Sequence, residues 1–116
     1  MRFQTLKNTD DFKWVFKNGK PIKADFLLAK LVKNKLGYLR VGIVVSNKVS
    51  GKAVLRNQIR RRIREAIRDN DSNMRANVDL VITALPTTIG KRFKDIAVSI
   101  DTIIDKINIA DSATVR

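Results

Sequence analysis

The chain has 116 residues, with 24 Lys and Arg against 11 Asp and Glu, so its net charge is +13. This length is enough for one domain with one core, and the hydrophobic content of 44% excludes a disordered chain. The excess of positive charge indicates a polyanionic partner. Cysteine and histidine are absent, which excludes disulfides, thiolate metal sites and the commonest general base.

The first part of the chain predicts a short helix after a loosely ordered segment, residues 1–8. Thr9 is a good N-cap, and two aspartates follow it at the positive end of the helix. Phe12 and Phe16 share one face of this helix, which ends before Gly19. The two rings either belong to the core or form a stacking platform for bases, and the pattern alone allows both.

Three apolar runs predict strands over residues 22–33, 38–46 and 78–85. Both sides of the first run are apolar, so we expect the sheet to be covered at least in part on each face. Isoleucines at helical spacing predict a last helix over residues 93–107, followed by a loose tail, residues 109–116. We therefore expect an α+β fold, a small two-layer α/β sandwich in the order α-β-β-(β)-α-β-α.

The most informative segment is residues 52–68, which carries seven Lys and Arg and a single acidic residue, Glu65. Its apolar residues recur at helical spacing and predict one buried stripe: Leu55, Ile59, Ile63, Ala66 and Ile67. The opposite sector holds Asn57, Arg60, Arg61, Arg64 and Arg68. A merely solvated helix would mix acids with its bases, so we interpret this one as a rigid, phosphate-binding row of guanidinium groups.

Catalysis by this chain is not indicated, because helix caps, turns and solvated helix faces account for most carboxylates. We predict no catalytic residue and no metal ligand. Single-stranded RNA fits better than DNA, because strands precede and follow the arginine-rich helix and no helix-turn-helix partner lies beside it. A structural ribosomal RNA-binding protein and a small DNA-binding protein remain the alternatives.

One pattern in this segment resembles a known family. Ser46-x-Lys48-Val49 followed by Ala53-Val54-x-Arg56-Asn57-x-Ile59-Arg60-Arg61-x-Ile63-Arg64-Glu65 is similar to the arginine-rich signature of the protein subunit of bacterial ribonuclease P. The segment DDFKWVFKNG and the run Arg40-Val41-Gly42 also match that family, and the resemblance covers about residues 5–107.

The resemblance implies a fold, a role and partners. It implies a left-handed β-α-β crossover around the arginine-rich helix, against the usual right-handed rule. It also implies one RNA-binding domain, residues 1–116, that assists removal of the 5′ leader from precursor tRNA. The catalyst would be the RNA subunit with its own Mg²⁺. The protein would be cytoplasmic, would bind the catalytic RNA and precursor tRNA, and would need neither a membrane nor a protein partner.

The resemblance also implies which residues bind each RNA. Contacts to the RNA subunit would come from Lys52, Arg56, Asn57, Arg60, Arg61, Arg64 and Arg68. A cleft for the single-stranded leader would be formed by Phe12, Phe16, Leu27, Val44, Lys48 and Arg56. Two positions depart from the family pattern: Gln58 replaces an arginine, and Ala29 stands where many members carry an aromatic residue, so we expect weaker stacking of the leader.

Overall fold

The structure is a computed structural model and describes residues 3–70 and 77–109. The elements in chain order are β1 Gln4–Thr5, α1 Thr9–Asn18, β2 Lys20–Ala24, β3 Leu27–Lys33, β4 Arg40–Val44, α2 Ala53–Asp69, β5 Val78–Ala84, the 3₁₀ turn η2 Pro86–Thr88 and α3 Phe93–Ile109.

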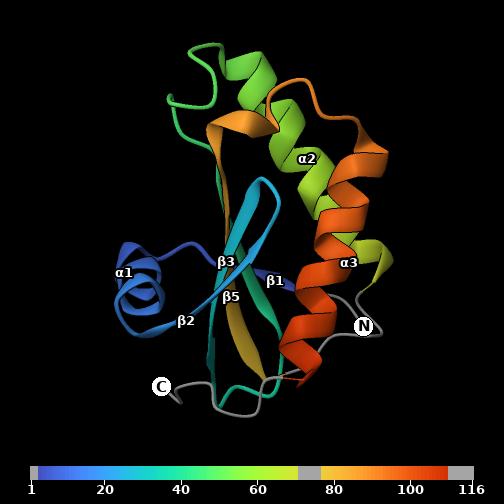
Figure 1. Cartoon of the computed structure of the whole chain (residues 1–116). Helices are drawn as coiled ribbons and strands as arrows, with labels where there is room; N and C mark the ends of the chain where they lie inside the picture. Colours follow the sequence, from blue (N-terminus) through green and yellow to red (C-terminus); the bar gives the residue numbers. More distant parts are fainter. Residues whose placement is uncertain (1–2, 71–76, 110–116) are drawn as a thin grey trace.

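The strands form one mixed sheet in the order β1-β4-β5-β3-β2. Strands β4 and β5 are parallel neighbours, and α2 connects them, while β3 runs antiparallel to both β5 and β2. Helices α2 and α3 lie on one face of the sheet and α1 lies on the other (Figure 1). The predicted α+β class is therefore confirmed, and the left hand of the β4-α2-β5 crossover stays a prediction.

The alternation of side chains along the strands explains these layers. Leu80 and Ile82 of β5 point into the main core under α2 and α3, whereas Val81 between them joins a smaller cluster under α1. Helix α2 contributes the buried residues that its spacing predicts, Ile59, Ile63, Ala66 and Ile67. Burial of these side chains fixes which side of α2 faces outward.

The predicted strand over residues 22–33 is wrong in one respect, because the structure divides it into the hairpin β2-β3. Ala24 pairs with Leu27 across a two-residue turn. Asp25, the first turn residue, has a φ of 55°, and aspartate tolerates this left-handed backbone better than most residues. A run of twelve residues with an aspartate at its fourth position is thus divided between two paired strands.

A loosely ordered segment was predicted over residues 1–8, but the described part of it, residues 3–8, includes a strand and a helix cap. Gln4 and Thr5 form β1, which pairs in parallel with β4, and Leu6 is only 2% exposed. The helix α1 that follows is capped by Asn8, whose side chain accepts a hydrogen bond from the Asp10 backbone N–H at 2.9 Å. Of the predicted C-terminal tail, residues 110–116 lie outside the described part.

Candidate nucleic-acid interface

Three arginines of α2 are held by backbone carbonyl groups next to the helix. Arg56 donates to the carbonyl oxygen of Ser50 at 3.0 Å, and Arg62 donates to that of Lys91 at 3.0 Å. Arg60 donates to the carbonyl oxygen of Val45 at 3.1 Å and to Oδ1 of Asn57 at 2.7 Å. These bonds tie the helix to the end of β4 and to the loop before α3, so part of the arginine row also serves the fold.

Three other arginines of the predicted RNA-binding set are free. Within residues 3–70 and 77–109, the side chains of Arg61, Arg64 and Arg68 make no hydrogen bond or ion pair with a described residue. Arg61 and Arg68 are exposed and Arg64 is half-buried. Lys52, also in that set, is exposed and precedes the first helical residue. These four side chains therefore offer positive charge for which no other described residue competes.

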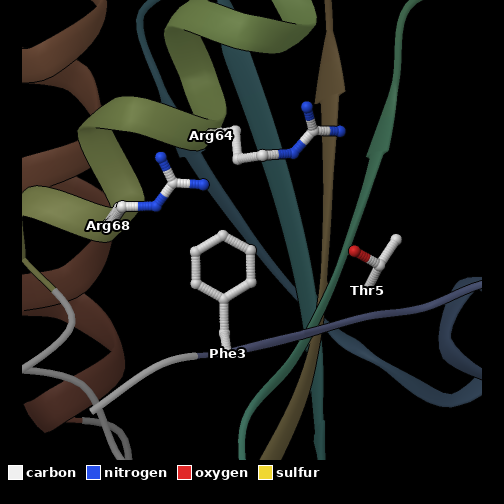
Figure 2. A pocket seen from close by; sticks show the side chains of 4 residues that line it. All are labelled: Phe3, Thr5, Arg64 and Arg68. Carbon is white, nitrogen blue, oxygen red and sulfur yellow. The ribbon is translucent and has the colours of Figure 1, made fainter.

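The departure at Gln58 lies on a different flank of α2. Its side chain lines a groove between α2 and the start of α3, together with Leu55, Arg62, Ile89, Arg92 and Phe93. The free arginines Arg64 and Arg68 instead line a pocket with Phe3 and Thr5 beside β1 (Figure 2). Because the two flanks are distinct, the loss of an arginine at position 58 leaves the row that contains Arg64 and Arg68 unchanged.

The two phenylalanines of α1 have different environments. Gly42 of β4 lies directly under the Phe12 ring, so that a Cβ at position 42 would overlap it. Phe16 is 40% exposed, and its ring centroid lies 6.5 Å from that of Phe12. Lys30 of β3 donates to the carbonyl oxygen of Phe16 at 2.7 Å and thereby holds the end of α1 against the sheet. Phe12 is thus mainly a packing residue, whereas the ring of Phe16 is exposed at the surface.

A row of three sheet residues continues this surface. Val44, Thr83 and Leu28 are register partners on β4, β5 and β3, and all three are half-buried. They lie on the α1 face, because on each strand they are two residues away from Gly42, Val81 and Lys30, which face α1. We call the exposed ring of Phe16 together with this row the α1 surface.

The structure contradicts the placement of Leu27 in the predicted cleft. Leu27 is fully buried in the main core under α2 and α3, on the face of the sheet opposite Val44. The neighbouring Leu28 takes the predicted place. Ala29 is also buried in the main core. An aromatic side chain at position 29 would therefore not lie on the α1 surface, and the alanine there gives no reason to expect weaker stacking of the leader.

A buried ionic network holds α1 to the sheet. Asp79 of β5 is fully buried and accepts two hydrogen bonds from the Arg40 guanidinium group, at 2.8 and 2.6 Å. Arg40 also donates to Asp11 of α1 at 3.2 Å, and the Asn34 side chain donates to Asp79 at 2.8 Å. The hydrogen bond to Asp79 is the main reason why the pKa of Arg40 is raised above its ordinary value.

The remaining predicted residues extend the basic surface. Lys48 is exposed in the turn after β4, and Asn57 is exposed on α2. The α1 surface and the pocket beside β1 also include Leu28, Thr83, Phe3 and Thr5, which the sequence did not single out. The hairpin turn at Asp25 was the available signal for Leu28, whereas Phe3 and Thr5 depend on a pairing of only two residues, which no local pattern reveals.

Among residues 3–70 and 77–109, no three His, Cys, Asp or Glu side chains gather closely enough to hold a metal ion. None of the helices in the same ranges combines the length and the apolar character that crossing a membrane requires.

A sheet with an arginine-rich helix on one face and an aromatic helix on the other defines a small α+β protein suited to binding a polyanion. The model of the family described as Ribonuclease P matches residues 1–108. The ribonuclease P protein component of Clostridioides difficile is 41% identical over 110 residues, which cover 94% of this chain and 96% of that protein.

Solved structures agree with this result. The ribonuclease P protein of Staphylococcus aureus, solved at 2.0 Å, superposes with a TM-score of 0.81 at 28% identity, covering 88% of this chain and 93% of that one. The Thermotoga maritima protein gives the same TM-score and identity, covering 90% and 97%. The chain therefore belongs to the bacterial ribonuclease P protein family.

Proposed function

We propose that this subunit binds the catalytic RNA of ribonuclease P through α2 and the 5′ leader of precursor tRNA through the α1 surface. In this way it assists the endonucleolytic removal of the leader that gives the mature 5′ end of tRNA. The observation that carries the first part is the set Arg61, Arg64 and Arg68, whose side chains have no partner among the described residues.

Binding of the catalytic RNA is supported by charge and by rigidity. The buried stripe of α2 fixes the helix on the core, and so the outward guanidinium groups lose little further freedom when they meet phosphates. Each phosphate contact releases counterions, and with the basic residues of α2 engaged we expect log K to fall with log salt with a slope of roughly −4 to −7. Lys52, Arg56 and Asn57 extend this surface at the start of the helix.

Binding of the leader is supported by the α1 surface. An exposed ring beside a shallow, half-buried strand row is suited to an unstacked base, because stacking tolerates any sequence. Lys48 lies in the segment that follows β4, the strand of Val44, and Arg56 lies in the first turn of α2. In this proposal the leader leaves the α1 surface at Val44 and meets these two basic side chains on its way to the catalytic RNA.

The chemical step belongs in this proposal to the RNA and its Mg²⁺. The described part of the chain offers no acidic cluster for a metal ion, and the protein positions phosphates instead. The reaction would take place in the cytoplasm, where precursor tRNA is made in bacteria.

The test is reconstitution of the holoenzyme. The protein is added to a bacterial ribonuclease P RNA, and cleavage of precursor tRNA is measured at low Mg²⁺. We expect stimulation by the wild type and a loss of most of it in the variant with both Arg61→Ala and Arg64→Ala. Lys94→Ala on α3 is the matched control, because this exposed residue lies away from the arginine row.

Two outcomes would overturn the proposal. One is the absence of both stimulation and tight binding to ribonuclease P RNA. The other is binding that a ribosomal RNA fragment of equal length displaces as well as ribonuclease P RNA does, which would favour a structural ribosomal RNA-binding protein.

A further inference from the structure

A pocket of about 410 Å³ lies between the N-terminal strand and the second half of α2. Phe3, Thr5, Arg64 and Arg68 line it, and Figure 2 shows these four side chains directed toward one space, with the Phe3 ring below the two guanidinium groups. Arg64 and Arg68 are one helical turn apart, and Phe3 and Thr5 are two residues apart in an extended chain, so each pair shares a face.

The lining combines the groups that recognise a nucleotide. The Phe3 ring is half-buried against the main core, which holds its position. Among the described residues, the cation–π contact is that of Lys91 on Phe26, and neither Arg64 nor Arg68 makes one with the Phe3 ring. Arg64 and Arg68 have no partner within the described ranges. The Thr5 hydroxyl group can donate and accept a hydrogen bond.

We propose that this pocket takes one unpaired nucleotide of the catalytic RNA, with its base stacked on Phe3 and its phosphate bound between Arg64 and Arg68. The inference rests on the proposed function and adds a defined contact to it. The nucleotide must be unpaired, because a base inside a helix has both of its faces covered by its neighbours. The volume of the pocket suits a small ligand of this size.

The position of the pocket indicates which RNA supplies the nucleotide. Thr5 is the register partner of Val41, and Val41 faces the core under α2, whereas Leu6 faces α1. The pocket and the α1 surface therefore lie on opposite faces of the sheet. A leader held on the α1 surface does not reach the pocket, and the catalytic RNA along α2 does.

The experiment compares the wild type with Phe3→Leu, Phe3→Tyr and Arg68→Ala in complex with ribonuclease P RNA. Leucine keeps the apolar contact with the core but removes the ring, and tyrosine keeps the ring. Affinity is measured over a series of salt concentrations, and 2′-hydroxyl acylation is measured at every nucleotide. Unfolding in urea checks that each variant is folded.

We expect an unpaired nucleotide of the RNA that is protected by the wild type and by Phe3→Tyr, and unprotected with Phe3→Leu or Arg68→Ala. Phe3→Leu should weaken binding about fivefold or more with an unchanged salt slope, because stacking releases no counterion. Arg68→Ala should reduce the salt slope by about 0.7 to 0.9.

The outcomes separate this inference from the proposed function. If the wild type binds the RNA and Phe3→Leu gives the same protection and affinity, the pocket is not a nucleotide site, and the proposed function stands. If the wild type does not bind the RNA, both the proposed function and the inference about the pocket are wrong. A titration followed by the NMR signals of the Phe3 ring adds a direct readout: uridine 5′-monophosphate should shift them at lower concentration than inorganic phosphate, and equal responses would reduce the pocket to an anion site and overturn the proposal.

Discussion

Arg40 and Asp79 lie opposite each other on the parallel strands β4 and β5, and two hydrogen bonds of 2.8 and 2.6 Å join them beneath α1. Asp11 extends this pair to the helix itself. A charge pair in a buried position gives little net stability, but either partner alone is costly. The pair therefore fixes the place of α1, and with it the ring of Phe16, relative to the sheet.

Removal of one partner should destabilise the fold strongly. Asp79→Ala leaves the Arg40 guanidinium beneath α1 with only Asp11 as a counter-charge, and we expect a loss of about 3 kcal/mol in the free energy of unfolding. Replacement of both partners by leucine should cost less than Asp79→Ala alone. Urea unfolding of the wild type, the single variant and the double variant measures this, and a double variant at least as destabilised as Asp79→Ala would contradict the account.

The exposed ring of Phe16 should matter for the substrate and not for the fold. Phe16→Ala should change the free energy of unfolding by less than about 1 kcal/mol, because the side chain is 40% exposed. It should weaken binding of precursor tRNA with a long leader by about tenfold, with little effect on tRNA without a leader. Val98→Ala, at another exposed apolar residue, on α3, is the control, and an equal loss on both substrates would assign Phe16 to the core.

Gly42 should tolerate no side chain. A Cβ at this position overlaps the Phe12 ring, and overpacking of this kind typically costs about 1–3 kcal/mol. Gly42→Ala should therefore lower the urea midpoint and also weaken leader binding, since α1 must shift. Gly51, where an added Cβ meets nothing within 4 Å, provides the matched substitution, and an equal effect of Gly51→Ala would argue against the steric cause.

Arg61 should contribute to RNA binding alone. It is exposed and has no partner in the described ranges, so Arg61→Ala should leave stability unchanged and reduce the slope of log K against log salt by about 0.7 to 0.9. Arg62→Ala is the comparison, because Arg62 donates to the Lys91 carbonyl group. We expect its stability to fall by about 1 kcal/mol, and filter-binding assays over a salt series together with urea unfolding distinguish the two.

Asp95 should make a small contribution to stability that depends on pH. Its carboxylate accepts a hydrogen bond from the Arg92 backbone N–H at 3.0 Å, and chiefly this bond lowers the pKa of Asp95 below its ordinary value of 3.8. The contribution is therefore fully present above pH 3.8 and is lost as the pH falls further through the pKa of the folded state. We expect the difference in urea midpoint between the wild type and Asp95→Asn to become smaller as the pH is lowered from about 6 to about 3. If this difference in midpoint does not change with pH, the charge of the Asp95 carboxylate makes no contribution to stability.

Most of the fold follows from patterns along single elements. The stripe of α2 and the isoleucines of α3 repeat at helical spacing, and burial confirms both. The hairpin β2-β3 was less visible, since its turn contains a buried apolar residue, Phe26, and only one polar residue. The chain therefore resembles one long strand, and the face on which Leu27 lies cannot be read from its alternation.

The interface was predictable in its charge and less so in its geometry. The arginines of α2 are evident from the sequence, but the division between those bound to carbonyl groups and those left free depends on loops that are distant along the chain. Lys91 and Arg62 are an example of such a pair. The pocket beside β1 likewise depends on the approach of Phe3 and Thr5 to Arg64 and Arg68, which lie far from them along the chain.

The short strand β1 also has a consequence for how the free protein behaves in solution. By pairing with Arg40 and Val41 it covers the backbone groups at the start of β4, so that only the short remainder of that strand, Gly42–Val44, is left at this edge. At the other edge, β2 carries Lys20, Pro21 and Lys23, a composition that disfavours pairing with another strand. Within the described residues, the sheet thus presents no long apolar edge to a second copy. This arrangement protects the protein from aggregation while it is not bound to RNA.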